Sequence, residues 1–182
     1  MEREITVPIL SDSHGHGNRA EMILQRLRRI GAAADEMIFL GDGTRDLLRY
    51  LPDGVRVYAV KGNCDGFGGT VIIDNDGFEV PVERIEFVGG KKLLLMHGHE
   101  YSVKSGKGLA LARGVSVGAD VVLFGHTHEP YCQRIEKGTE IAGTTLVKDL
   151  FVFNPGALAG GSFGILTVKG GEILLSHGRI AD

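Results

Sequence analysis

The chain has 182 residues, of which 43% are hydrophobic and 24% are charged, and its formal net charge is -3. These proportions exclude a disordered chain, and the length suits one domain better than two. The negative charge supplies no basic field that would hold a nucleic acid polymer non-specifically. We therefore expect a single domain over residues 1–182 that does not bind nucleic acid polymers.

The sequence also lacks the patterns of membrane and disulfide-rich proteins. No stretch approaches the roughly 18 consecutive apolar residues that a membrane-spanning helix needs. The apolar run Ile5–Leu10 is too short for the core of a signal peptide. The two cysteines, Cys64 and Cys132, lie far apart, which argues against a disulfide framework. We therefore expect a cytoplasmic protein that does not contact a membrane.

The first third of the chain alternates short apolar runs with helical patterns. Ile5–Leu10 predicts a buried strand, although Pro8 favours an edge strand or a strand end. Arg19–Ile30 has apolar residues at three-to-four-residue spacing, which predicts an amphipathic helix that Asn18 could cap. Two further strands and a helix between them are predicted at Met37–Leu40, Val55–Val60 and Asp46–Leu51. This alternation indicates parallel strands joined by crossover helices.

The rest of the chain is richer in strands. Phe78–Val88 and Lys91–Met96, separated by two glycines, predict a hairpin. Tyr101–Val117 predicts a helix that three glycines weaken. Further strands are expected at Asp120–Phe124, Tyr131–Glu136, Thr144–Phe153, Phe163–Val168 and Glu172–Ser176. The sequence therefore predicts an α/β fold whose second half is mostly β.

Five of the apolar runs end directly in a loop rich in Asp, Asn or His. In chain order these loops are Ser11-Asp12-Ser13-His14-Gly15, Gly41-Asp42-Gly43, Gly62-Asn63-Cys64-Asp65, His97-Gly98-His99 and Gly125-His126-Thr127-His128. Taken alone, each loop is an ordinary turn or helix cap. With His16, which directly follows the first loop, three of them account for six of the seven histidines. Ligands of open α/β sheets bind beyond the carboxyl ends of strands. The pattern predicts a metal site at one sheet edge.

The expected ligands are carboxylate, amide and imidazole groups. Such a set suits Mn²⁺, our first choice, and also Zn²⁺, Fe, Ni²⁺ and in some cases Mg²⁺. One ion cannot use so many ligands, whereas two ions that share a bridging carboxylate can. Pairs of ions about 3.5–4 Å apart are a common device for phosphoester hydrolysis. We therefore expect two divalent ions.

At this point the chain resembles a known family. The ordered motifs Asp12-x-His14, Gly41-Asp42, Gly62-Asn63, His97 and Gly125-His126-x-His128 are similar to those of the calcineurin-like metallophosphoesterases. The small size and the form of the third loop resemble the YfcE-like phosphodiesterase branch and the related retromer subunit. The resemblance extends from Ile5 to Asn154-Pro155-Gly156. It implies a four-layer α/β/β/α sandwich of two mixed sheets flanked by helices.

The resemblance also implies a ligand set and a mechanism. The first metal would be bound by Asp12, His14 and His128, the second by Asn63, His97 and His126, and both by a bridging Asp42. A hydroxide between the metals would attack phosphorus in line. Asp42, Asn63 and His97 would position this hydroxide and the phosphate, so that catalysis would depend on positioning and electrostatics.

Cys64 is a departure from the family pattern. Many members have a His at this position, which is taken to protonate or stabilise the leaving group. A thiol is a weak hydrogen-bond donor with an ordinary pKa of about 8.5. We therefore expect a preference for esters whose leaving group needs little protonation, such as aryl esters or strained cyclic phosphates. The alternative is that Cys64 is a small, half-buried filler.

Other residues near the motifs are expected to support the site. Asp65 is interpreted as holding the neighbouring loop, and Asn154-Pro155-Gly156 as scaffolding. His16 and His99 could orient a metal ligand or contact phosphate, and a supporting or surface role is favoured. Residues that line a substrate pocket would have to come from stretches such as Phe67–Thr70 and Tyr101–Lys107. The hairpin around Gly89 is a candidate contact for a homo-oligomer.

The expected function is hydrolysis of small phosphodiesters. A phosphomonoesterase or protein phosphatase is a rival, disfavoured by Cys64 and the short loops. A nuclease is disfavoured by the charge and by the lack of interleaved basic and aromatic residues. A non-catalytic scaffold like the retromer subunit would be expected to have damaged ligands, whereas all seven predicted ligand positions are intact.

Overall fold

A computed structural model describes residues 4–32, 35–51, 53–66, 77 and 79–180, so the expected pocket stretch Phe67–Thr70 lies outside the described residues. Two five-stranded mixed sheets form its centre. The first sheet has the order β12-β11-β1-β2-β3. In chain order its strands are β1 (Ile5–Leu10), β2 (Glu36–Phe39), β3 (Arg56–Ala59), β11 (Ser162–Lys169) and β12 (Glu172–Arg179).

The second sheet has the order β4-β5-β6-β10-β7. In chain order its strands are β4 (Glu83–Val88), β5 (Lys91–Met96), β6 (Val121–Leu123), β7 (Pro130–Ile135) and β10 (Leu150–Pro155). A separate ribbon pairs β8 (Glu140–Ile141) with β9 (Thr144–Thr145). The predicted Phe78–Val88/Lys91–Met96 hairpin is confirmed as β4–β5, with β4 beginning only at Glu83.

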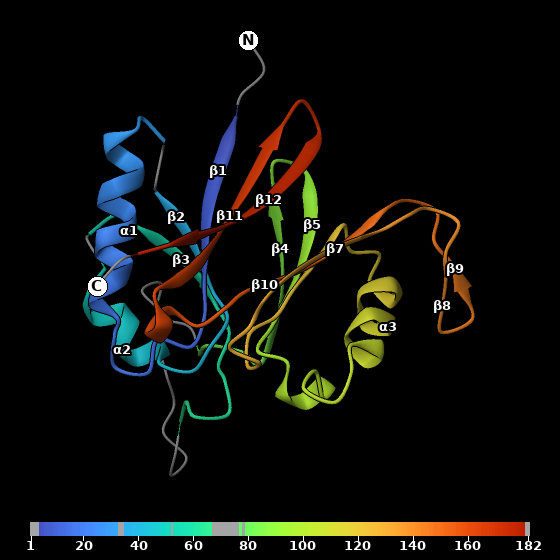
Figure 1. Ribbon diagram of the computed structural model, residues 1–182, viewed down its shortest axis with the longest axis horizontal. Helices are drawn as coiled ribbons and strands as arrows, with labels where there is room; N and C mark the ends of the chain where they lie inside the picture. Colours follow the sequence, from blue (N-terminus) through green and yellow to red (C-terminus); the bar gives the residue numbers. More distant parts are fainter. Residues whose placement is uncertain (1–3, 33–34, 52, 67–76, 78, 181–182) are drawn as a thin grey trace.

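Helices cover the outer faces of both sheets. Helices α1 (Asn18–Arg29) and α2 (Thr44–Arg49) pack on the first sheet, and α3 (Gly108–Ser116) packs on the second (Figure 1). Two short 3₁₀ turns, η1 (His99–Tyr101) and η2 (Leu158–Gly160), lie in the connections. The predicted four-layer α/β/β/α sandwich is therefore confirmed. In the described part of the chain, no helix is long and apolar enough to cross a membrane.

The central strands are apolar on both faces because both faces are covered. In β1, Ile9 packs between the sheets, whereas Leu10 packs towards the helices on the outer face. On the second sheet, Leu93 and Leu95 of β5 face the same inter-sheet core as Ile9. A parallel strand buried on both sides is expected to be a continuous apolar run rather than an alternating one.

The strand directions bring the predicted loops to one edge. β1, β2 and β3 are parallel to one another, and so are β5, β6 and β10. Each sheet is completed by antiparallel neighbours, such as β11 beside β1 and β7 beside β10. Because the carboxyl ends of parallel strands meet at the same edge, the loops that follow β1, β2, β3, β5 and β6 gather there.

The expectation that Pro8 marks an edge strand or a strand end is wrong, because Pro8 lies inside β1, the central strand of the first sheet. The ladder between β1 and β2 begins only at Ile9. Leu10 directs its carbonyl to the β2 side, where it accepts a hydrogen bond from Leu40 N–H at 2.8 Å. Pro8 has the same orientation, so its missing N–H falls just before this ladder starts and costs no ladder bond.

Three further expectations about local structure are wrong. Tyr101–Val117 is not one helix, because Ser102 has a φ of 50° and Gly106 a φ of 159°, which break the helical path before α3. Asn18 is the first residue of α1 rather than its cap. The N-cap is Gly17, whose N–H donates to the Asp46 carboxylate at 3.0 Å. The predicted strand Thr144–Phe153 is interrupted, and forms β9 and β10.

Candidate metal centre

Backbone hydrogen bonds join the predicted ligand loops to one another. Asp12 N–H donates to Gly41 O at 2.9 Å, which ties the loop after β1 to the loop after β2. Gly125 N–H donates to His97 O at 3.0 Å, which ties the loops after β5 and β6 in the second sheet. Each sheet thus presents a rigid pair of neighbouring loops at the shared edge.

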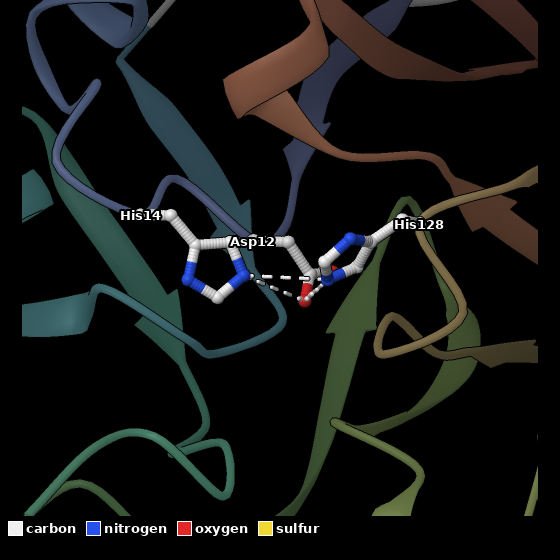
Figure 2. A group of neighbouring side chains, drawn as sticks. All are labelled: Asp12, His14 and His128. Atoms are coloured by element: carbon white, nitrogen blue, oxygen red, sulfur yellow. Dashed lines mark hydrogen bonds and ion pairs between the residues drawn. The ribbon is translucent and has the colours of Figure 1, made fainter.

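Asp12, His14 and His128 form a first cluster. His128 Nε2 lies 3.2 Å and His14 Nε2 3.8 Å from Asp12 Oδ1, and the two imidazole nitrogens are 3.3 Å apart. Figure 2 shows the two rings converging on the buried carboxylate. Three ligand atoms at such separations can hold one cation.

Asp42, His97 and His126 form a second cluster beside the first. His97 Nε2 lies 3.3 Å from Asp42 Oδ2 and 4.0 Å from Asp12 Oδ1, so the buried His97 ring faces both carboxylates. The His97 and His126 rings have centroids 5.0 Å apart. A carboxylate oxygen of Asp42, a ring nitrogen of His14 and Cys64 Sγ also lie within 4.8 Å of one another. The Asp42 carboxylate therefore stands between the two clusters.

Two buried polar atoms between the clusters have no hydrogen-bond partner in the described part of the chain. They are Asp12 Oδ1 and His97 Nε2. His97 Nδ1 lies 2.7 Å from Leu40 O, which places the proton of the neutral ring on Nδ1 and leaves Nε2 as a lone-pair donor. Leaving buried groups unpaired costs about 1–3 kcal/mol each. A divalent cation would satisfy both atoms, so the residues fit a metal site.

Asn63 is exposed on the loop after β3. Its side-chain amide donates to Cys64 Sγ at 3.3 Å. Cys64 N–H in turn donates to Asp42 Oδ1 at 2.7 Å, which joins this loop to the second cluster. A role of Asn63 as a metal ligand stays a prediction.

Most of the predicted ligands have a left-handed backbone. Positive φ values of 53°, 40°, 59°, 67° and 62° occur at Asp12, His14, Asp42, His126 and His128. This conformation is uncommon outside glycine and clusters at functional sites, where the surrounding structure holds it in place. Here the strained backbone turns the side chains of short loops towards a common point.

The Asp12 carboxylate is oriented by one of its two oxygens. Oδ2 accepts hydrogen bonds from Ser11 Oγ at 2.6 Å and from His126 N–H at 3.1 Å. Oδ1 is thereby directed at the histidines. Gly125 allows this contact between the sheets, because a Cβ at this position would collide with the Ser11 hydroxyl and approach the Asp12 carboxylate.

Asp65 holds the loop of Asp42, as the sequence predicts. Its carboxylate accepts hydrogen bonds from three consecutive N–H groups, those of Asp42 at 2.8 Å, Gly43 at 2.9 Å and Thr44 at 3.0 Å. The Thr44 hydroxyl and Gly62 N–H also donate to it. The part played by Thr44 was not predicted, although its place after Gly-Asp-Gly and before a helix is a signal for such a contact.

Asn154 supports the loop that carries His126 and His128, which confirms the predicted scaffolding role. Its side-chain amide donates to Gly125 O at 2.9 Å and to Thr127 Oγ1 at 3.1 Å. His177, for which no role was predicted, contacts Asn154 O through Nε2 at 2.8 Å. No local pattern identifies His177, because the contact depends on how β12 approaches β10.

Asp42 and His97 shift each other's pKa because Asp42 Oδ2 and His97 Nε2 lie 3.3 Å apart. Burial opposes ionisation, but the neighbouring His97 and the Cys64 N–H group hold the pKa of Asp42 well below its usual range. Burial would lower the pKa of His97, but Asp42 and Asp12 raise it. Burial and the neighbouring charges of His97 and Lys104 lower the pKa of His126 to about 4. His126 is therefore a neutral imidazole at pH 7, the form that binds metals.

The remaining two histidines differ in their surroundings. His16 is exposed, with Nδ1 3.3 Å from Ser13 O, which agrees with a surface role. His99 is half-buried, and its ring lies 5.5 Å from that of His97 and 6.0 Å from that of His126. Burial and the charge of His97 lower the pKa of His99. His99 therefore lines the second cluster as a neutral ring.

Comparison with known proteins agrees with this geometry. The family model described as the calcineurin-like phosphoesterase superfamily domain matches residues 5–171. "Probable metallophosphoesterase YsnB" of Bacillus subtilis is 32% identical over 155 residues, which cover 85% of this chain and 75% of that protein.

Solved structures share the fold. The structure of Vacuolar Protein Sorting 29 from Cryptosporidium parvum has a TM-score of 0.64 at 16% identity, covering 98% of this chain and 99% of that one. A novel archaeal phosphodiesterase has a TM-score of 0.61 at 21% identity, covering 95% and 99%. With the family match over most of the chain and the candidate metal ligands at the expected sheet edge, this protein belongs to the calcineurin-like phosphoesterase superfamily.

Proposed function

We propose that this protein is a metal-dependent phosphodiesterase that hydrolyses small phosphodiesters with two divalent ions, of which Mn²⁺ is the first candidate. The proposal rests on two buried atoms between the ligand clusters, Asp12 Oδ1 and His97 Nε2, which lie 4.0 Å apart and have no hydrogen-bond partner among the described residues. One cation beside each atom would satisfy both clusters and would place two positive charges next to each other.

In this proposal each predicted ligand has a defined role. Asp12, His14 and His128 would hold the first ion, Asn63, His97 and His126 would hold the second, and Asp42 would contribute to both. The grouping of Asp12 with His14 and His128, and of Asp42 with His97 and His126, supports these roles. Such ions supply positive charge that lowers the pKa of water and neutralises phosphate oxygens. The chain supplies fixed geometry, since Asp65 and Asn154 hold the ligand loops before substrate arrives.

Cys64 supports a preference for good leaving groups. Burial, the hydrogen bond to Asp42 and the charges of Asp42, Asp65 and Asp12 raise the pKa of the thiol to about 11. In the metal-free protein the thiol thus keeps its proton at neutral pH. A thiol is also only a weak hydrogen-bond donor, so it gives little protonation to a leaving alkoxide. Aryl diesters and strained cyclic phosphates do not need this help. The archaeal phosphodiesterase of the same fold supports a diester rather than a monoester substrate.

The rival function is that of a protein-binding scaffold, and the similarity in fold to Vacuolar Protein Sorting 29 favours it. A scaffold does not need two unpartnered ligand atoms buried in a strained site. The two functions therefore differ in whether metal binding produces hydrolysis.

The deciding experiment measures bound metal and hydrolysis together. Chelator-treated protein is reconstituted with Mn²⁺, Zn²⁺, Fe²⁺, Ni²⁺ or Mg²⁺ and assayed with bis(p-nitrophenyl) phosphate and p-nitrophenyl phosphate. We expect two ions per chain and faster hydrolysis of the diester, both lost in Asp42→Ala. Bound metal without hydrolysis of either ester would instead favour the scaffold, and faster hydrolysis of the monoester would favour a phosphomonoesterase.

A further inference from the structure

A pocket of about 310 Å³ opens beside the candidate metal centre. It is lined by Val103, Lys104, Lys107, Thr127, Glu129, Pro130 and Tyr131. This volume lies at the lower end of the range of about 300–1,000 Å³ for small-molecule sites. The sequence analysis expected pocket residues within Tyr101–Lys107, and three of the lining residues come from this segment.

The pocket shares a wall with the metal centre. Thr127 stands between the predicted ligands His126 and His128 in the loop after β6. The Thr127 hydroxyl accepts a hydrogen bond from Asn154 at 3.1 Å and from Glu129 N–H at 3.3 Å, so this wall is held by the same contacts as the ligand loop. Lys104 lies near enough for its charge to act on His126.

The pocket favours a negatively charged group. Lys104 and Lys107 supply two positive charges against the single negative charge of Glu129. Lys107 Nζ lies 4.3 Å from the centre of the Tyr131 ring, which fixes the ammonium group over the aromatic wall. Lys107 is also the N-cap of α3, so the positive end of this helix begins at the pocket.

We propose that this pocket binds a second anionic group of the substrate, a phosphate or carboxylate carried by the ester at a distance from the phosphorus that is hydrolysed. The inference rests on the proposed function and specifies its substrate class. The two ligand clusters already provide for the charge of the reacting phosphate. The two lysines lie outside these clusters and provide for a further negative charge.

The test compares thymidylyl-(3′→5′)-thymidine with and without a 5′-terminal phosphate, because the two dinucleotides have the same scissile diester. We measure kcat/KM with Mn²⁺-loaded protein for the wild type and for Lys104→Gln, Lys107→Gln and Glu129→Gln. The wild type is expected to have a kcat/KM about fivefold higher for the phosphorylated dinucleotide. This ratio corresponds to the attraction between two opposite unit charges roughly 4 Å apart in water-like surroundings. Lys137→Gln makes the same charge change on the exposed β7–β8 connection and is the matched control.

The preference is the ratio of kcat/KM for the phosphorylated dinucleotide to that for the unphosphorylated one. Each lysine variant is expected to lower this ratio towards one, Glu129→Gln to raise it, and Lys137→Gln to leave it unchanged. A wild-type preference near one would overturn the inference, and so would a preference that survives in both lysine variants.

A second measurement separates this inference from the proposed function. Hydrolysis of bis(p-nitrophenyl) phosphate reports on the function alone, because this ester has no second anionic group. Calorimetry with chelator-treated protein reports on the pocket alone. If no ester is hydrolysed, the proposed function fails. The inference about the pocket is still supported if calorimetry shows that the phosphorylated dinucleotide binds more tightly than the unphosphorylated one, and if Lys104→Gln abolishes this difference in affinity. Equal binding of the two dinucleotides would refute it.

Discussion

The N–H group of Asp42 donates to the Asp65 carboxylate at 2.8 Å, so the proposed bridging ligand is positioned by a residue that does not itself bind metal in our scheme. The same carboxylate accepts the next two N–H groups, of Gly43 and Thr44. The left-handed backbone of Asp42, with a φ of 59°, is thus stabilised by three hydrogen bonds to one side chain.

We predict that Asp65→Ala reduces metal affinity by about 10–100-fold, the usual effect of losing a residue that orients a metal ligand. The reason is that the Asp42 loop loses its acceptor while every proposed ligand remains. Calorimetric titration of chelator-treated protein with Mn²⁺ measures the change. Asp53→Ala, at an exposed position, is the control. Unchanged affinity in Asp65→Ala would show that the loop holds its shape without these bonds.

We predict that Cys64→Ala retains most of the activity on bis(p-nitrophenyl) phosphate, because an aryl leaving group needs no proton from the thiol. Cys64→His is expected to increase hydrolysis of a diester with an alkoxide leaving group, up to the roughly 10²–10⁴-fold typical of general acid catalysis. Steady-state kinetics on both esters measure the effects, with Cys132→Ala as the control. Loss of most aryl diester activity in Cys64→Ala would assign the thiol a direct catalytic role.

We predict that Gly125→Ala lowers the free energy of unfolding by about 1–3 kcal/mol, the usual effect of overpacking, and weakens metal binding. The added Cβ would meet the Ser11 hydroxyl and displace the Asp12 carboxylate. Urea unfolding and metal titration measure both effects. Gly160→Ala is the matched control, because nothing lies within 4 Å of a Cβ built there. Equal stability of the two variants would contradict the close approach.

We predict a pH-dependent contribution of Glu83 to stability. Hydrogen bonds from Arg113, opposed by burial and helped by Tyr101, lower the pKa of Glu83 from its ordinary value of 4.5. A carboxylate with a lowered pKa stabilises the fold above its unfolded pKa, and this contribution is lost as the pH falls through the folded value. The stability difference between wild type and Glu83→Gln should therefore be largest near pH 7 and should shrink below about pH 4.5.

Urea unfolding of chelator-treated protein at pH 7, 5, 4 and 3 measures this difference. Arg134→Gln, which removes the exposed partner of the half-buried Asp149, serves as a comparison for a less buried pair. A difference that stays constant between pH 7 and pH 3 would show that Glu83 acts through packing rather than through charge.

The sequence predicted the central strands and the sheet edge of the site well, because both depend on local patterns. Buried strands such as β1, at Ile5–Leu10, are continuous apolar runs, and the polar loops follow them directly. Glycines and histidines in those loops indicate their chemistry without knowledge of the packing. The family resemblance then gave the four layers, which no local pattern contains.

The errors fall where tertiary contacts override local propensity. Pro8 lies in a central strand because the neighbouring ladder starts one residue later. The segment Tyr101–Val117 has a helical pattern, but its left-handed Ser102 leads the chain around the pocket before α3 begins. The contact between His177 of β12 and Asn154 of β10 joins the two sheets, and the sequence does not reveal how the sheets pack on each other.

The two sheets contribute different halves of the proposed site. Asp12 and Asp42 follow strands of the first sheet, whereas His97, His126 and His128 follow strands of the second. A folding intermediate with only the first sheet assembled would hold Asp12, Asp42 and His14 without the other three histidines. One with only the second sheet would lack both carboxylates, so either intermediate could capture an ion only weakly. The metal should therefore bind late in folding and should stabilise the packing of the two sheets against each other. Slow release of the ion would then slow the separation of the sheets during unfolding.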